Sequence, residues 1–340
     1  LFRSLMPREQ EVRSHAHSEF ELPKPESMTA MSRETLRSRA EWLRRLREFF
    51  WERSFIEVET PVVSRDTVID LHIDPIPLSL PGRSSRFYLQ TSPEYLMKRL
   101  LMLGEPAIFQ IAHAFRAEET GFQHNPEFTM CEWYRVGDDY QAGQELLAEL
   151  AQVMFDVDGC NRLTYRKAFR QWAGVDPFND STSRIRGLCD EWLGKQVDGV
   201  ARDVCLDLLF SEKVQPQLGQ GIPTLLTDFP AEQSALAKVT AREYGWVAER
   251  YELFWKGLEL ANGYHELLDP EELAARQHQV NVKRVEAGKK PLPERSRLLD
   301  AMTTGLPPCS GVALGVERAL QAFLDLESIS EVMPFPIDQA

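Results

Sequence analysis

The segment from residue 248 to residue 266 constrains the fold most, because it is typical of two strands joined by a tight turn. Strand-forming residues flank Lys256-Gly257, a pair suited to a two-residue hairpin turn. Such a turn pairs position 254 with Glu259 and Glu252 with Ala261. Paired residues share one face of a sheet, so the turn predicts that Glu252 and Glu259 lie on one face, within ~7–8 Å.

Two carboxylates this close repel each other unless a cation lies between them, and Mg²⁺ with a polyphosphate meets that need. Glu266 follows Glu259 by an odd number of residues, which would place it on the opposite face. Asn262-Gly263 supplies an irregularity that could turn it back. The alternative is that one or more of these glutamates are ordinary solvent-facing strand residues.

A second antiparallel hairpin is predicted between Ala107 and Arg135, around a polar loop at 119–126. Arg116 and Glu118 share one face of its first strand. Four alternating residues share one face of its second strand: Phe128, Met130, Glu132 and Tyr134. An arginine, an aromatic ring and acids on one platform are able to hold a phosphate, stack a flat base and bind an amine. An amphipathic hairpin with a polar outer face is the alternative.

The segment Gly311–Arg318 predicts a short apolar strand that opens into a helix over residues 319–326. A glycine at the strand end lets a ligand approach the backbone. An arginine in the first helical turn is able to reach a phosphate that the helix N-terminus also attracts. A helix start with a surface arginine is the alternative.

The remaining chain predicts one large domain over residues 33–340, preceded by a flexible tail over residues 1–32. An amphipathic, arginine-rich helix is expected at 35–51, followed by a strand at 55–61. Residues 140–250 are expected to be mainly helical. Asp269 and Gly288 have the positions of the N-cap and C-terminal glycine of another helix.

The composition and the missing motifs exclude several functions. There are 52 acidic and 39 basic residues, a net charge of −13, which argues against electrostatic coating of duplex nucleic acid. Five scattered cysteines without a CxxC pair indicate neither a disulfide framework nor a zinc site, and favour a reducing cytoplasm. No signal peptide, membrane span, P-loop, dinucleotide-binding fingerprint or nucleophile elbow is found. His265–Asp269 resembles a zincin motif but ends in Asp.

The three segments together resemble the catalytic core of class II aminoacyl-tRNA synthetases, and within it the lysyl-tRNA synthetase branch. Residues 55–61 resemble motif 1, residues 115–130 motif 2 and residues 311–318 motif 3. The resemblance covers roughly residues 35–340. It implies an α+β fold, in which a six- or seven-stranded antiparallel sheet is flanked by helices, and a homodimer joined through motif 1.

About 35 residues precede the first helix, too few for the N-terminal OB-fold that reads the anticodon in a full lysyl-tRNA synthetase. Residues 91–95, 132–134 and 309–315 instead resemble the stand-alone paralogues that attach (R)-β-lysine to a lysine of elongation factor P. Ala313 replaces a glycine of the tRNA synthetases in the amino-acid pocket. Ala117 and Glu317 replace the usual Asn and Asp.

The resemblance implies ATP and Mg²⁺ as cofactors. Arg116 would hold the α-phosphate and the substrate carboxylate, while Phe128 and Arg318 would enclose the adenine. Glu252 and Glu259 would bind Mg²⁺. Further residues implied at the ATP site are Glu118, Asn125, Leu260 and Gly315.

The same resemblance implies an amino-acid site. Glu94 would bind the α- or β-amine, and Glu266 with Tyr134 would bind the ε-ammonium group. Ser92, Glu132 and Ala313 complete this predicted site.

The implied function is an ATP-dependent ligase that activates (R)-β-lysine as an adenylate and transfers it to elongation factor P, with tRNA disfavoured as acceptor. A truncated lysyl-tRNA synthetase that charges tRNA or another acceptor with lysine is one alternative, and a non-catalytic regulatory paralogue is another. A basic cluster is a candidate docking surface for an acidic acceptor, weighed against a solvated helix and loop: Arg276, Lys283, Arg284, Lys289, Lys290, Arg295 and Arg297.

Overall fold

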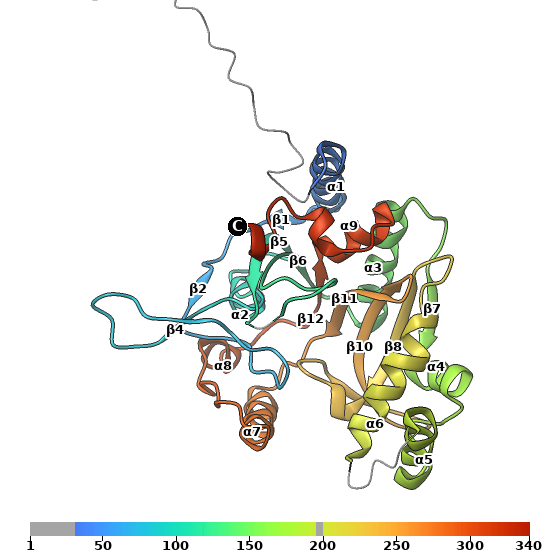
Figure 1. Cartoon of the computed structure of the whole chain (residues 1–340). Helices are drawn as coiled ribbons and strands as arrows, with labels where there is room; N and C mark the ends of the chain where they lie inside the picture. Colours follow the sequence, from blue (N-terminus) through green and yellow to red (C-terminus); the bar gives the residue numbers. More distant parts are fainter. Residues whose placement is uncertain (1–30, 118, 195–199) are drawn as a thin grey trace, which may run out of the picture.

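The computed structural model describes residues 31–117, 119–194 and 200–340 (Figure 1). Most of the predicted tail and Glu118 therefore lie outside the described residues. The helices are α1 (Arg33–Trp51), α2 (Glu94–Leu101), α3 (Tyr140–Phe155), α4 (Tyr165–Ala168), α5 (Thr182–Leu193), α6 (Arg202–Leu209), α7 (Pro270–Glu286), α8 (Arg297–Met302) and α9 (Val316–Leu324). None of these helices is long and apolar enough to span a membrane.

The strands of the described residues form one large and one small sheet. The large sheet has the order β1 (Ile56–Glu57), β5 (Ala107–Phe115), β6 (Glu127–Val136), β12 (Cys309–Gly315), β11 (Leu258–His265), β10 (Gly245–Trp255), β8 (Thr224–Pro230) and β7 (Asn161–Thr164), with β9 (Val239–Arg242) paired to β10. The small sheet contains β2 (Val63–Ser64), β4 (Phe87–Leu89) and β3 (Pro77–Leu78).

The predicted α+β class is confirmed by the pairing in the large sheet. Its six neighbouring strands from β5 to β8 are antiparallel throughout. Only the outer pairs, β1 with β5 and β7 with β8, are parallel within the described ranges. Antiparallel neighbours place alternating side chains of successive strands on one common face, and this builds a broad platform.

The hairpin of β10 and β11 confirms the predicted turn but corrects the predicted register. Lys256 and Gly257 both have positive φ angles, of 53° and 77°, as a two-residue type I′ turn requires. Phe254 pairs with Glu259 as expected, but Glu252 pairs with Asn262 rather than with Ala261. The strand β11 therefore carries one extra residue, a β-bulge at Leu260.

The bulge decides which side chains face the platform. It reverses the alternation along β11, so Asn262, Tyr264 and Glu266 follow Glu259 on the face of Glu252. The irregularity expected at Asn262-Gly263 is thus present two residues earlier. His265 ends a strand rather than opening a helix, which excludes the zincin interpretation.

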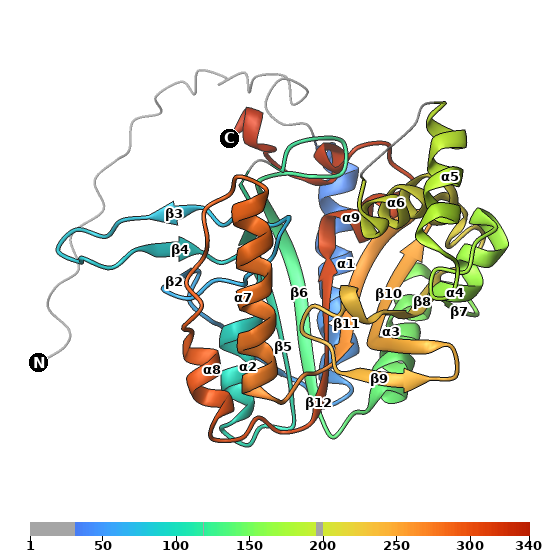
Figure 2. The same ribbon diagram turned by 90° about the horizontal axis from the view of Figure 1, so that it is seen from below.

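One face of the sheet is closed by α1, α3 and α9. Trp42, Leu46 and Phe50 of α1 pack against Phe109 and Trp133 of the central strands, and all five are buried. Figure 2 shows α1 on this side of the sheet and α7 on the other. Burial of this aromatic cluster leaves the opposite face, with α2, α7 and α8 at its edges, available for a site.

The stretch 140–250 is mainly helical as predicted, through α3 to α6, but it also contributes β7, β8 and β9. All seven residues of β8 are buried. Periodicity does not reveal this strand, because its sequence, TLLTDFP, has no regular apolar–polar alternation. Leu226 and Phe254 join the core cluster under α4 to α6, so these helices cover one end of the platform.

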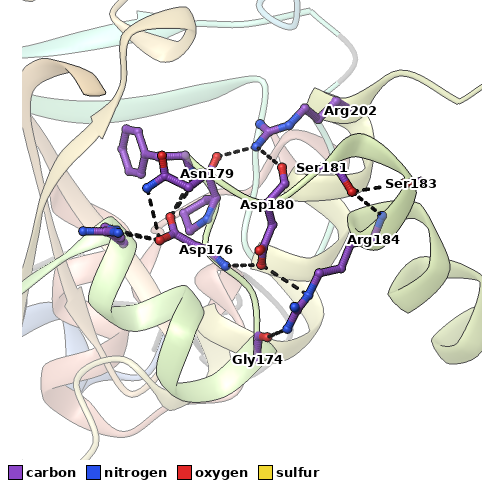
Figure 3. Close-up of polar contacts among 11 residues, drawn as sticks. Gly174, Asp176, Asn179, Asp180, Ser181, Ser183, Arg184 and Arg202 are labelled. Atoms are coloured by element: carbon purple, nitrogen blue, oxygen red, sulfur yellow. Dashed lines mark hydrogen bonds and ion pairs between the residues drawn. The ribbon is translucent and has the colours of Figure 1, made fainter. Parts of the chain in front are cut away.

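The loop before α5 is held by charged side chains (Figure 3). Asp180 Oδ2 accepts a hydrogen bond from the Asp176 backbone N–H at 2.8 Å and lies 3.3 Å from Arg184 Nε. Arg184 also donates to the Gly174 carbonyl, while Arg202 at the start of α6 donates to the Asp180 carbonyl. These contacts fix α5 and α6 against each other at the edge of the domain.

Candidate active site

A cavity of about 540 Å³ opens on the platform face, between the central strands, α2 and α7. Its volume is typical of pockets for small molecules and cofactors. It brings together these predicted residues: Ser92, Glu94, Arg116, Asn125, Phe128, Glu132, Tyr134, Glu259, Leu260, Glu266, Ala313, Gly315 and Arg318. Glu252 does not line it. Glu118 lies outside the described residues.

At one end of the cavity, arginine and aromatic side chains face each other. The Arg116 guanidinium carbon lies 4.9 Å from the centroid of the Phe128 ring, so the two side chains are in cation–π contact. Arg116 Nε is buried and has no hydrogen-bond partner in the described part of the chain. A buried donor without a partner is costly, and an anionic ligand would satisfy it.

Arg318 is held by the loop between β5 and β6. It donates to the carbonyls of Gln123 at 3.2 Å and Glu259 at 3.3 Å, and Arg318 Nη2 lies 2.6 Å from His124 Nε2. Burial and the Arg318 charge lower the pKa of His124, so its ring accepts this hydrogen bond in the neutral form. The sequence patterns did not single out His124.

Gly315 is open to the cavity. A Cβ placed there would meet only the Leu260 carbonyl oxygen, at 3.9 Å, among the described atoms. Packing inside the protein therefore does not demand a glycine at this position. The space above its backbone is open to a ligand.

Glu252 and Glu259 share the platform face but have different surroundings. Glu259 is partly exposed in the cavity, whereas Glu252 is buried and paired with Arg250. Burial raises the pKa of Glu252 to about 7; the Arg250 charge opposes this shift and the Glu259 charge adds to it. Of these two predicted magnesium ligands, Glu259 is the one that faces the cavity and could hold a magnesium ion on a polyphosphate.

At the other end, Glu132 lies between two hydroxyl groups. Tyr134 Oη donates to its Oε1 at 2.6 Å and Ser92 Oγ to its Oε2 at 2.8 Å. Burial nevertheless raises the pKa of Glu132 to about 8, and the nearby Glu94 charge adds to the shift. A buried carboxylate of this kind is stabilised by a cationic ligand.

Glu94 and Glu266 are joined by Lys98, a residue that the sequence patterns did not single out. Lys98 Nζ donates to Glu94 Oε1 at 2.6 Å, and it lies 2.6 Å from Glu266 Oε2 as an ion pair without hydrogen-bond geometry. Burial raises the pKa of Glu266 to about 7; Lys98 opposes the shift and Glu94 adds to it. The i,i+4 spacing of Glu94 and Lys98 was the one signal in the sequence, but such pairs are usually solvent-exposed.

Two positions on β12 shape this end of the cavity. A Cβ at Gly311 would lie 2.2 Å from the Tyr134 ring and 2.5 Å from Glu266 Oε1, so only glycine fits there. Ala313 pairs with Glu132 across the β6–β12 ladder, and its methyl group therefore stands on the platform face beside that carboxylate.

Asn125 has a role within the protein. It is buried, its amide donates to the Glu127 carbonyl at 2.6 Å, and its Oδ1 accepts from the Ile337 backbone N–H at 3.0 Å. It thus anchors the C-terminal segment beside the cavity that it lines.

The candidate docking cluster is dispersed by the fold. Arg284 is buried and pairs with Asp74 at 2.7 Å, and Lys289 pairs with the same carboxylate at 2.6 Å. Arg276 is paired with Glu272 on its own helix. The exposed members that remain are Lys283, Lys290, Arg295 and Arg297.

Comparison with known proteins agrees with this architecture. A family model described as class II tRNA synthetases (D, K and N) matches residues 26–339. An elongation factor P–(R)-β-lysine ligase of Vibrio parahaemolyticus is 42% identical over 312 residues, covering 89% of this chain and 95% of the relative. Proteins of the same name from Vibrio cholerae and Pseudoalteromonas translucida are 41% and 43% identical, covering 92% and 90% of this chain and 98% and 96% of the relatives.

The antiparallel platform, its cavity and these matches define a class II synthetase catalytic domain, and the chain belongs to the class II tRNA synthetase family (D, K and N). Within that family, the Vibrio and Pseudoalteromonas relatives all carry the name elongation factor P–(R)-β-lysine ligase.

Proposed function

We propose that this protein is an ATP-dependent ligase that activates (R)-β-lysine as an adenylate and transfers it to a lysine side chain of elongation factor P. The names of relatives that cover about nine-tenths of the chain support this function. The structural observation that carries it is the amino-acid end of the cavity, where Glu94, Glu132 and Glu266 are all buried. Buried carboxylates need cations, and a diamino acid supplies two.

In the first step, a carboxylate oxygen of the substrate attacks the α-phosphorus of ATP and the bond to pyrophosphate breaks. Arg116 stabilises the charge that develops on the α-phosphate, and Arg318 holds the leaving phosphates. Phe128 stacks against the adenine and Gly315 lets the nucleotide lie against the backbone. Glu259, with Glu252 behind it, would hold Mg²⁺, which would offset phosphate charge. Positioning supplies most of the acceleration, because no side chain needs to accept a proton in this step.

In the second step, the ε-amine of the acceptor lysine attacks the carbonyl carbon of the mixed anhydride. An amide bond forms, AMP leaves and the attacking nitrogen loses a proton. Glu94 holds the β-amine of the substrate, while Glu266 and Tyr134 hold the ε-ammonium group. Ser92 and Glu132 complete the polar wall, and Ala313 limits the space beside it.

The proposal includes a homodimer formed through α1 and β1, the region that resembles motif 1, and a cytoplasmic location. All five cysteines are described and none is in a disulfide, which suits a reducing compartment.

Two measurements test the proposed function. ATP–pyrophosphate exchange should depend on (R)-β-lysine, and mass spectrometry of elongation factor P incubated with enzyme and ATP should show one added β-lysyl group. Equal or better exchange with α-lysine would refute the substrate assignment. Charging of tRNA without modification of elongation factor P would favour a truncated lysyl-tRNA synthetase. Failure to form any adenylate would favour a regulatory paralogue.

A further inference from the structure

Lys98 is a buried cation at the centre of the carboxylate cluster. Its side chain is 2% exposed, and it contacts Glu94 one helical turn earlier and Glu266 at the end of β11. The charges of both carboxylates raise the pKa of Lys98 against the effect of burial, so it stays an ammonium ion. Lys98 does not line the cavity, whereas Glu94, Glu132 and Glu266 do. It therefore stands behind the carboxylates and out of reach of a ligand.

The charges at this end of the cavity balance in only one way. Three carboxylates and one resident ammonium leave a net charge of minus two when all are ionised. Uncompensated charge in a buried site is expensive, so the bound state is expected to be neutral. A ligand with two ammonium groups meets this condition. A ligand with one leaves a carboxylate that must keep its proton.

We propose that Lys98 is a positioning and specificity residue: it supplies the third ammonium of the amino-acid pocket, so that three ionised carboxylates match a substrate with two amines. This inference rests on the proposed function. It also gives Lys98 a geometric role, because its Nζ atom lies 2.6 Å from both Glu94 Oε1 and Glu266 Oε2 and so fixes the two carboxylates relative to each other.

The titratable groups around Lys98 come from four elements. They are Glu94 and Tyr95 on α2, Glu132 and Tyr134 on β6, Tyr264 on β11 with Glu266 after it, and Cys309 on β12. Arg250 and Glu252, which also act on Tyr264, pair with each other. Burial raises the pKa of the Tyr134 hydroxyl and the Cys309 thiol well above neutrality, so both remain uncharged. The balance is therefore set by the three glutamates and Lys98.

The first test replaces Lys98 by a neutral side chain of similar length. Lys98→Met should raise the KM for (R)-β-lysine in ATP–pyrophosphate exchange at least tenfold at pH 7, because one carboxyl must stay protonated in the complex. The KM for ATP should not change. Lys256→Met is the matched control: this lysine is paired with Asp325 at the β10–β11 turn, outside the cavity lining, and both KM values should be preserved.

The second test separates charge balance from a purely structural role. Glu132 has hydrogen bonds to Ser92 and Tyr134 rather than to Lys98, so coupling between the two positions must be electrostatic. Glu132→Gln alone leaves two carboxylates facing three ammonium groups in the complex. Adding Lys98→Met restores a balance of two carboxylates and two ammonium groups. The double variant should therefore have a KM for (R)-β-lysine equal to or below that of Glu132→Gln.

The opposite outcomes would overturn the inference. They are an unchanged KM in Lys98→Met, or the same loss from this substitution in the wild-type and Glu132→Gln backgrounds. If Lys98→Met alone does not fold, the double variant still tests the inference. Its pocket is balanced, so it should fold and have the KM for (R)-β-lysine of Glu132→Gln. A double variant that also fails to fold would show that Lys98 serves stability alone. Absence of exchange with (R)-β-lysine in the wild-type enzyme would instead refute the proposed function.

Discussion

Arg39 of α1 and Glu317 of α9 form a buried ion pair, with Arg39 Nη2 2.7 Å from Glu317 Oε1. Arg39 also donates to Thr129 Oγ1 at 2.9 Å, and the second oxygen of Glu317 accepts from the Thr129 backbone N–H at 2.8 Å. Arg39 thus links the first helix to Thr129 and Glu317, which are the chain neighbours of Phe128 and Arg318.

We expect Arg39→Gln to misplace both sides of the nucleotide site. Loss of a charge-assisted hydrogen bond costs ~1.5–3 kcal/mol, so the KM for ATP should rise ~10-fold or more while the KM for the amino acid stays within about twofold. Arg45→Gln is the control, since Arg45 on the same helix pairs with Asp156, away from the cavity. An equal rise of both KM values in Arg39→Gln would contradict this prediction.

Gly311 and Gly315 lie on one strand but should respond differently to alanine. At Gly311 the added Cβ would overlap Tyr134 and Glu266, so Gly311→Ala should lower the free energy of unfolding by ~1–3 kcal/mol or more and impair binding of the amino acid. At Gly315 the Cβ has room within the protein, so Gly315→Ala should keep the thermal unfolding temperature but weaken ATP binding. Calorimetry with and without ATP distinguishes the two outcomes.

Glu252→Gln and Glu259→Gln should have different effects on stability and on the magnesium requirement. Glu252→Gln removes the carboxylate partner of Arg250, whose side chain is 20% exposed, which should cost ~1.5–3 kcal/mol of stability. Glu259→Gln changes a partly exposed residue, so its stability should be close to that of the wild type while exchange activity needs more Mg²⁺. Denaturant unfolding and a magnesium titration measure these effects. Equal magnesium requirements in the wild type and Glu259→Gln would argue against Glu259 as a ligand.

The sequence predicts those parts of the fold that are determined by local rules. The turn at Lys256-Gly257 requires two positive φ angles, and the helix after Asp269 has a side-chain cap, so both are confirmed. The strand β8 was missed because a fully buried strand lacks alternation. The bulge at Leu260 was misplaced because register depends on the neighbouring strands as well as on the turn.

The residues of the candidate site divide in the same way, into those that local patterns predict and those that depend on distant neighbours. Alternation along β6 placed Phe128, Glu132 and Tyr134 on one face, and the structure brings all three to the cavity. Lys98 and Arg39 could not be found in this way. Their significance depends on partners 168 and 278 positions away, Glu266 and Glu317, which only the folded chain brings close.

The pH dependence of substrate binding should reveal the carboxyls of the amino-acid end. Burial raises the pKa of Glu132 to about 8 and that of Glu266 to about 7. Both must lose their protons before they can bind ammonium groups, so binding releases protons and is favoured by higher pH. We expect the KM for (R)-β-lysine to fall as the pH rises from about 6 to about 8, by up to tenfold per pH unit for each proton released.

Glu132→Gln removes the carboxyl group with the higher pKa. The KM of this variant for (R)-β-lysine should therefore no longer change with pH above about pH 7. The KM for ATP, measured at saturating amino acid, should be the same in Glu132→Gln and the wild type at each pH, because the nucleotide end lacks Glu132 and Glu266. Initial-rate exchange assays across this range provide the measurement. A KM for (R)-β-lysine that is constant or that rises with pH in the wild type would show that the carboxyls are already ionised in the empty pocket.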